Sequence, residues 1–465
     1  MVLYIVIIKN NSFDSEVFIL KKIFFVLCLL SFLSCMAFAD VYQHFNYTVK
    51  NNTVSITGLT ATTVYMLAIP AEIDGKKVTE IADGAFRSRN IQTVVIPDTI
   101  NRIGKEAFYG CQNLSNVVMP DTVLEIGEAA FQDCYSLFSV SMPRFLLKIE
   151  PNTFRDCRSL LDITLPSSLR SIGVDAFNGC SSLVSVFVPD TVTSIGEFAF
   201  HNCSSLKSFT FPKNCTVVPR SIFNGCSSLT TVQLHSAMQE IQPFAFFNCI
   251  ELESINLPNS IKTIGMSAFM HCTSLRTLYL PATITELSEN VFSHCTGLIS
   301  VSLPYRLEKI RGRAFWGCTN VVELYIPDSV TSIEMGAFFE CESLLRIHLP
   351  ENITSIPRNM MQGCESLKDI VIPKNVTEIG DCAFADCKAL LSINIPRSVR
   401  TIGAEAFYGC QKLARLEIPA TVRSIGKDAF TGLSSLLRIF LARGSFAEQY
   451  LMSSSLKIRN VVYIN

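Results

Sequence analysis

The sequence predicts a right-handed solenoid in which one parallel β-sheet of about 16 strands runs along the array. The first reason is a cysteine column with a fixed step of 23 residues and no insertion, from Cys111 to Cys410. The second is a phenylalanine column three positions before the cysteines, broken only by Met361. Extending that column to Phe86 and Phe430 gives 16 units, the outermost two without the cysteine. Repeated units of this length stack because none can bury its own apolar face.

Each element of a unit has a physical reason. In residues 114–119, inward apolar side chains alternate with outward ones, which is typical of a short strand. Pro120 ends this strand because proline has no N–H for the ladder, and Gly127 allows the next turn. Residues 130–131 are expected to form a helical or 3₁₀ turn, with the Phe131 ring filling the convex side. We therefore expect the parallel sheet on the concave side, and short strands and these turns on the convex side.

The composition of the 465 residues excludes several classes of protein. Lysine plus arginine total 39 and aspartate plus glutamate 40, so a net charge of −1 gives no electrostatic footprint for nucleic acid or an anionic membrane. Only 17% of residues are charged while 49% are apolar, which excludes a disordered chain. Six histidines and one tryptophan leave few candidates for catalysis or metal binding.

The first 39 residues resemble a secretory signal peptide. Lys21 and Lys22 precede an apolar run at 23–36, and Ala39 closes an A-x-A cleavage pattern. A retained signal anchor is the alternative, and residues 1–20 suggest an over-extended start. Cys35 lies in a weak lipobox-like context and is a candidate for a lipid anchor. No later segment reaches 18 consecutive apolar residues, so no transmembrane span is expected in the mature chain.

The repeat motif L-x-x-h-x-h-P-x-x-h-x-x-I-G-x-x-A-F-x-x-C resembles the leucine-rich repeats of BspA-like bacterial surface proteins, which also occur in treponemal proteins. The resemblance covers about residues 42–465. It includes segments similar to the family's N-terminal hairpin cap, its longer first repeat and its C-terminal helix cap. The expected domains are a signal peptide (1–39), a cap hairpin (40–63), the leucine-rich-repeat array (64–441) and a C-terminal cap of helix plus strand (442–465).

The cysteine column leaves three alternatives open. Buried free thiols, disulfides between adjacent strands, and metal ligands all fit a column of identical positions. Free thiols are favoured because every copy lies beside the phenylalanine and leucine columns. Cys215 replaces an aliphatic residue of another column and should be buried, whereas Cys382 stands in a mostly polar column and should be exposed.

The sequence shows no constellation for catalysis. His271 and His294 lie one repeat apart, each before a column cysteine, and His201 lies nearby. They are either a zinc site with the thiols or surface histidines in a variable column, and we favour the second. No nucleophile–base–acid set and no phosphate loop stand out, so neither a cofactor nor an enzymatic activity is expected.

The outward positions of the strands form the predicted binding face. Its first two-thirds are small, neutral and hydroxylated, whereas charge and aromatic rings concentrate between residues 279 and 440. Tyrosine and arginine are enriched at interface hot spots, although an exposed sheet also tolerates aromatic residues without any function. The candidate ligand-binding residues are Tyr279, Glu323, Tyr325, Arg346, His348, Arg415, Arg438 and Phe440.

Three functions follow as hypotheses. The resemblance implies an exported adhesion module that binds a protein or other macromolecular ligand of a host or neighbouring cell on the concave sheet. Such a protein would be found at the cell surface, associated with the outer membrane, or secreted. The alternative is a structural envelope protein without a specific ligand. A hydrolytic enzyme is the third and least favoured hypothesis, because the repeats leave no room for another domain.

Overall fold

The computed structural model describes residues 45–61, 64–453 and 461–464. Residues 46–465 form one compact unit. The predicted signal peptide and Cys35 lie outside the described residues. Within the described ranges, no helix has the length and hydropathy that crossing a membrane requires.

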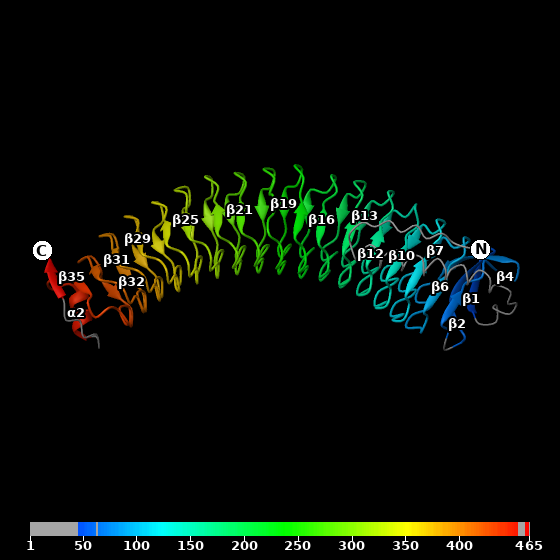
Figure 1. Ribbon diagram of the computed structural model, residues 1–465, viewed down its shortest axis with the longest axis horizontal. Coiled ribbons are helices and arrows are strands. Elements are labelled where there is room, and N and C mark those ends of the chain that lie inside the picture. The colour runs from blue at the N-terminus through cyan, green and yellow to red at the C-terminus, as the bar shows by residue number, and fades with distance from the viewer. Residues whose placement is uncertain (1–44, 62–63, 454–460, 465) are drawn as a thin grey trace, which may run out of the picture. The chain divides into compact units, whose positions relative to one another are not determined.

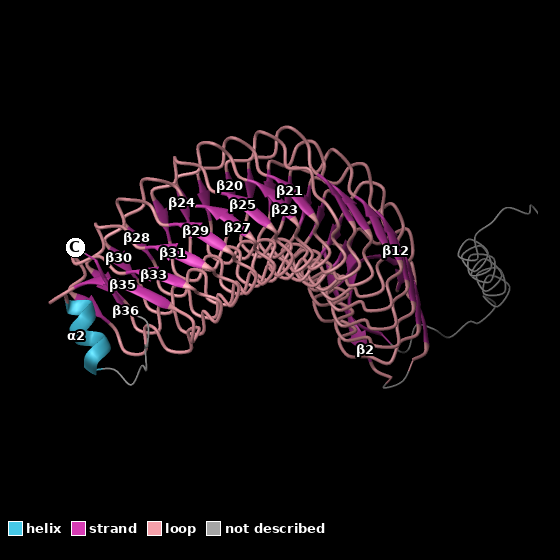
Figure 2. Cartoon of the chain, turned by 60° about the vertical axis from the view of Figure 1, so that its left-hand side comes forward, coloured by secondary structure: helices cyan, strands magenta, loops and turns pink. Residues whose placement is uncertain are grey.

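The repeat units contribute strands to two parallel ladders, which follow the chain from coil to coil, although residues 254–256 form no strand of the first (Figures 1 and 2). The first, which we name the three-residue ladder, contains β3 (Met66–Ala68), β6 (Thr93–Val95), β8 (Asn116–Val118), β10 (Ser139–Ser141), β12 (Asp162–Thr164), β14 (Ser185–Phe187), β16 (Ser208–Thr210), β18 (Thr231–Gln233), β21 (Thr277–Tyr279), β23 (Ser300–Ser302), β25 (Glu323–Tyr325), β27 (Arg346–His348), β29 (Asp369–Val371), β31 (Ser392–Asn394), β33 (Arg415–Glu417) and the longer β35 (Arg438–Ala442).

The second ladder consists of two-residue strands on the return path of each coil. It contains β7 (Arg102–Ile103), β9 (Glu125–Ile126), β11 (Lys148–Ile149), β13 (Ser171–Ile172), β15 (Ser194–Ile195), β17 (Val217–Val218), β19 (Glu240–Ile241), β20 (Thr263–Ile264), β22 (Glu286–Leu287), β24 (Lys309–Ile310), β26 (Ser332–Ile333), β28 (Ser355–Ile356), β30 (Glu378–Ile379), β32 (Thr401–Ile402) and β34 (Ser424–Ile425).

From β6 and β7 onward, the register of both ladders equals the sequence repeat. In the first, Ser139 of β10 lies opposite Asn116 of β8, and in the second, Lys148 of β11 lies opposite Ser171 of β13. All these pairs are parallel and 23 residues apart. The predicted parallel-strand solenoid is therefore confirmed, and each repeat position becomes a column of stacked side chains.

The phenylalanine column forms the centre of the core. Successive rings lie 5.1–6.2 Å apart between centroids, mostly face to face, and every member from Phe86 to Phe430 is buried. Met361 interrupts the stack and is itself fully buried. Burying a phenylalanine side chain contributes about 1.5–3 kcal/mol, so this column is a main source of stability in each coil.

The cysteine column links each coil to the preceding one. The thiol of each column cysteine donates a hydrogen bond to the backbone carbonyl oxygen of the phenylalanine column, at 3.0–3.3 Å between sulfur and oxygen. For example, the Cys134 thiol reaches the Phe108 carbonyl oxygen of the previous coil. The carbonyl already accepts one N–H within its own turn, and a small apolar side chain with one weak donor adds a second hydrogen bond to the same oxygen, which explains the repetition of cysteine here.

Two columns of left-handed residues shape the turn that carries the phenylalanine. In one coil, Glu106 has φ of 53° and Gly110 has φ of 68°. The N–H of Ala107 bonds to the Gly104 carbonyl, and the N–H of Cys111 to that of Phe108, so each left-handed residue lies within a β-turn. These β-turns take the place of the expected helical or 3₁₀ turn, because a left-handed residue cannot continue a right-handed helix.

The N-terminal end of the array carries four further strands, β1 (Phe45–Lys50), β2 (Thr53–Leu59), β4 (Glu72–Ile73) and β5 (Lys76–Ile81). β1 and β2 are joined through Asn51 and Asn52, both with positive φ, which a tight hairpin turn requires. β2 pairs in parallel with β5, which pairs with β7.

The C-terminal end carries α2 (Phe446–Ser453) and β36 (Val461–Ile464) (Figure 2). Ser445 caps the helix, because its hydroxyl oxygen accepts a hydrogen bond from the Glu448 N–H. The Tyr450 ring packs against Phe430 at 6.0 Å, and its hydroxyl donates to the Gly426 carbonyl. β36 pairs in parallel with β35.

Candidate functional site

The outward face of the three-residue ladder carries all eight candidate ligand-binding residues, on β21, β25, β27, β33 and β35. Most of them are well exposed: 77% of Tyr279 and 63% of Tyr325 face solvent. Phe440 is only half-buried, because an arginine covers its ring. The strand alternation predicted from the sequence thus places these side chains on one face, but the structure gathers only seven of the eight, in two separate clusters.

The first cluster consists of Glu323, Tyr325, Arg346 and His348. The parallel register of β25 and β27 sets Glu323 opposite Arg346 and Tyr325 opposite His348. The Arg346 guanidinium lies 3.4 Å from the Glu323 carboxylate, and the Tyr325 and His348 rings stack at 4.4 Å with planes 4° apart. The His348 Nε2 lies 3.7 Å from Asp328. Exposed ion pairs contribute at most about 1 kcal/mol to stability, so this ordered cluster adds little to the fold.

The second cluster consists of Arg415, Arg438 and Phe440. The Arg415 guanidinium carbon lies 3.9 Å above the centre of the Phe440 ring, and one of its nitrogens lies 3.2 Å from Glu417. Arg438 lies opposite Arg415 in the ladder register and is exposed. This end of the face therefore presents a cation held over an aromatic ring beside a second arginine.

The strands β29 and β31 separate the two clusters, and Tyr279 belongs to neither. On those two strands the outward residues are Asp369, Val371, Ser392 and Asn394. Tyr279 lies two coils before Tyr325, with Ser302 between them. One continuous surface of eight residues is therefore not formed.

The column thiols are poorly reactive. They are free and buried in the described part of the chain, and burial raises their pKa, in the case of Cys111 to about 12. Cys215 is buried, as predicted, and burial raises its pKa to about 11. A thiol attacks only as its thiolate, so these groups are poor nucleophiles at neutral pH.

Cys382 differs from the column but is less open than its polar column predicts. It is half-buried, with φ of 51°, and its sulfur lies 3.7 Å from the Glu405 carboxylate. Burial and then the negative charge of Glu405 raise the pKa of this thiol. Cys382 is therefore reachable but weakly ionised.

The two histidines that the sequence analysis paired do meet. The His271 and His294 rings stack at 4.8 Å with planes 3° apart, and burial followed by the neighbouring His294 lowers the pKa of His271. Among the residues that the structure describes, no group of three or more His, Cys, Asp or Glu side chains is placed to hold a metal ion. Their column is not freely variable, since both histidines have positive φ, a conformation that histidine tolerates better than most residues.

An aromatic chain around these histidines was not found from the sequence. Phe247 contacts His271 at 5.6 Å, the Trp316 ring contacts His294 at 4.5 Å, and Phe339 lies 5.9 Å beyond Trp316. All are half-buried at the turn before the cysteine column. Aromatic residues one or two positions before the cysteine in consecutive repeats were the signal.

Two arginine clamps on the two-residue ladder were also missed. Arg102 forms ion pairs with Glu80 on one side and Glu125 on the other, and the distance to Glu125 is 3.1 Å. Arg311 lies 2.8 Å from both Glu286 and Glu334. Each clamp joins three successive coils. The stacking of the repeats is enough to account for it, without a role in binding.

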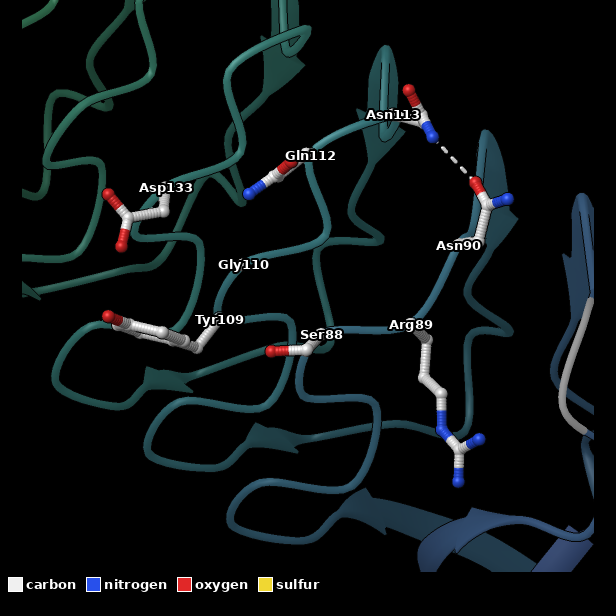
Figure 3. Close-up of a pocket in the computed structure, with 8 residues that line it drawn as sticks. All are labelled: Ser88, Arg89, Asn90, Tyr109, Gly110, Gln112, Asn113 and Asp133. Carbon is white, nitrogen blue, oxygen red and sulfur yellow. Dashed lines mark hydrogen bonds between the residues drawn. The ribbon is translucent and has the colours of Figure 1, made fainter.

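Two shallow hollows mark the surface. One, of about 410 Å³, opens over Gly110 near the N-terminal end, where Figure 3 shows Tyr109, Ser88, Gln112 and Asp133 around the glycine backbone. The other, of about 500 Å³, lies beside β21, β23 and β25, next to the predicted binding face. Neither of these two hollows is lined by a nucleophile, a base and an acid together.

Comparison with known proteins shows to which family this architecture belongs. The model of the BspA type leucine rich repeat region matches in six copies, at residues 79–207, 147–276, 193–322, 262–390, 308–437 and 354–464. The chain belongs to the BspA-type leucine-rich-repeat family. A leucine-rich repeat protein from Bacteroides ovatus is 30% identical over 86% of this chain and 99% of its own, with a TM-score of 0.72.

Two further solved structures, both of leucine-rich-repeat proteins, are similar in sequence. A leucine rich cell surface protein from Faecalibacterium prausnitzii is 27% identical over 90% of this chain and 99% of its own, with a TM-score of 0.44. The T. pallidum leucine rich repeat protein is 28% identical over 51% of this chain and 91% of its own, with a TM-score of 0.35. No curated protein matches the chain. BspA-type solenoids are repeat scaffolds suited to protein interaction, and fold membership alone names no ligand.

Proposed function

We propose that this chain is an exported adhesion module that binds a macromolecular ligand, a protein of a host or neighbouring cell, through the outward face of its three-residue ladder. The observation that carries the proposal is the first cluster. Its ion pair and stacked rings are ordered before any ligand arrives, yet they contribute little to stability. A preordered tyrosine and arginine on an exposed face suit recognition, because less side-chain freedom is lost on binding.

The N-terminal segment supports export, and the same proposal places the protein at the cell surface, outer membrane-associated or secreted, with Cys35 as a possible lipid anchor. Protease accessibility on intact cells, with a mass measurement of the mature N-terminus, tests this part. Cleavage after Ala39 together with surface digestion is the expected result. A chain protected from protease that keeps its first 39 residues would contradict it.

Binding itself is tested with the purified protein on immobilised extracellular-matrix proteins and on bacterial cells. The double variant Tyr325→Ser and His348→Ser should lose binding while its unfolding midpoint stays unchanged. The matched control is the double variant Val95→Ser and Val118→Ser, on the outward face of β6 and β8, far along the array. Equal binding by both variants would contradict the proposed face.

The second candidate function is a structural envelope protein without a specific ligand. It is favoured by the clamps of Arg102 and Arg311, which join coils and stiffen the solenoid. Loss of envelope integrity on deletion, without loss of adherence, would support it over adhesion. We propose no enzymatic activity for the array.

A further inference from the structure

The hollow beside β23 borders the outward face of the three-residue ladder. It is lined by Thr273, Ser274, Arg276, Gly297, Ile299, Asn320 and Val322, which come from three consecutive coils just before β21, β23 and β25. Gly297 occupies a column position held by Ser274 in the coil before and Asn320 in the coil after. Because a Cβ at Gly297 would lie 2.3 Å from the Thr273 carbonyl oxygen, only glycine allows the two coils to approach so closely beside the hollow.

The strand of the central coil is low on its outward face, although Ile299 just before it is exposed. Ser300 and Ser302 are the outward residues of β23, and both are small and exposed. Tyr279 lies opposite Ser302 on one side, and Tyr325 holds the same column on the other. With strands about 4.8 Å apart, the two tyrosines stand ~10 Å apart across the serine.

We name this feature the β23 groove. It combines the hollow, lined by Arg276, Gly297, Ile299 and Val322, with the low strand positions Ser300 and Ser302 between Tyr279 on one side and Glu323 and Tyr325 on the other. It runs parallel to the strand and is one strand wide.

The charge along the β23 groove is uneven. Arg276 is exposed and forms no ion pair among the described residues, although Glu253 holds the same column one coil earlier. The carboxylate of Glu323 on the opposite wall is already paired with Arg346. Ile299 and Val322, 45% and 37% exposed, add an apolar strip between them. The uncompensated charge of the groove is therefore one positive group beside apolar surface.

We propose that the β23 groove binds one extended segment of a partner protein, which sets an apolar side chain between Tyr279 and Tyr325 and a carboxylate against Arg276. An extended chain is one strand wide and advances about 3.3 Å per residue, so both contacts fall within a few residues. A guanidinium–carboxylate pair is a strong, directional hydrogen bond, and tyrosine walls supply contact area. This inference rests on the proposed function and names the chemistry of its partner.

The test uses a library of random eight-residue peptides displayed on phage and panned on the purified protein at low salt. Enriched peptides should share an acidic residue within a few positions of an apolar one. Arg276→Glu, which reverses the free charge, and Ser302→Tyr, which fills the gap between the tyrosines, should each weaken binding of a selected peptide at least tenfold. Arg170→Glu and Ser141→Tyr are the matched controls, at an exposed arginine and a ladder serine away from the groove, and should leave binding unchanged.

Unfolding midpoints show that each variant is folded. Failure to enrich any peptide, enrichment of basic peptides without an acidic residue, or binding unaffected by Arg276→Glu and Ser302→Tyr would overturn the groove. If the whole protein binds a matrix protein through Tyr325 and His348 while the groove variants bind equally well, the groove fails and the proposed function stands. If the protein binds no macromolecule and no cell, the proposed function fails. The peptide-binding results then decide on the groove independently.

Discussion

Phe246 and Phe187 are the same residue type in the same array, yet Phe246 is fully buried and 76% of Phe187 faces solvent. Phe246 belongs to the stacked column, 5.1 Å from Phe269, whereas Phe187 ends β14 on the outward face. The position within the repeat, and not the residue type, decides which side chain carries stability. Inward columns must repeat because each ring packs on the next coil, and outward columns are left free for function.

The largest effect is expected at high pH, where the buried thiols of the cysteine column should lower the stability of the folded protein. Burial raises the pKa of the column thiols, that of Cys111 to about 12, whereas an unfolded cysteine has a pKa of about 8.5. The folded state therefore holds its thiol protons more tightly, so stability is constant below about pH 8.5 and falls as the pH rises further, by up to about 1.4 kcal/mol per pH unit for each thiol in the cooperative unit. Urea unfolding at pH 7, 8, 9 and 10 measures this. A midpoint unchanged to pH 10 would show that the column is not made of buried thiols.

The two phenylalanines give the next largest contrast. Phe246→Ala leaves a cavity in the ring stack and should cost about 3–5 kcal/mol locally. Phe187→Ala is its matched control and should stay within about 0.5 kcal/mol of the original protein. Chemical unfolding of both variants provides the measurement. Similar losses at the two positions would abolish the distinction between inward and outward columns.

On the outward face, the comparison concerns binding. Tyr325→Ala should weaken binding to the protein's ligand about tenfold, the loss of roughly 1.4 kcal/mol typical of an interface anchor, with little change in stability. Val118→Ala, on the N-terminal part of the same ladder, should bind as the original does. Titration on an immobilised ligand gives the ratio, and a larger loss for Val118→Ala would move the binding face to the other end of the array.

The smallest effect concerns the left-handed columns. Cys382 has φ of 51°, a conformation that strains most residues and suits glycine, so Cys382→Gly should stabilise the protein by about 0.5–1 kcal/mol. Cys382→Val should destabilise it, because a β-branched residue is an outlier there. Thermal unfolding ranks the three proteins. Stability that follows side-chain volume instead, with valine highest, would show that packing outweighs the backbone at this turn.

Much of the fold follows from the sequence because columns of identical residues report stacking directly. The inward Phe131 and Cys134 columns and the outward position of Tyr325 were all predicted from spacing. The left-handed conformation of His271 was not, because glycine, aspartate, asparagine and histidine in one column look like variability until their shared φ is known. The clamps of Arg102 depend on how long side chains cross several coils, which no spacing specifies.

Spacing also predicts only part of how the candidate site residues are grouped. Residues 23 positions apart must be neighbours, so the stacking of Tyr325 on His348 could be read from the columns. The β23 groove could not, because it arises from small residues between large ones and from the close approach of Gly297 to the coil before it. The repeat column of a residue shows which face its side chain occupies. Whether that face is raised or hollowed there depends on the side chains of the adjacent coils.

Alkylation of the native protein tests the separation of inward and outward positions most directly. Prolonged treatment at pH 8, read by peptide mass spectrometry, should modify Cys382 among the 16 described cysteines, while the fourteen column thiols and Cys215 are labelled only after denaturation. Labelling of Cys382 should itself be slow, because burial and Glu405 raise its pKa. Equal labelling of several column cysteines in the native state would contradict the account, and so would column cysteines that stay unlabelled after denaturation without reductant, since they would then be disulfide-bonded.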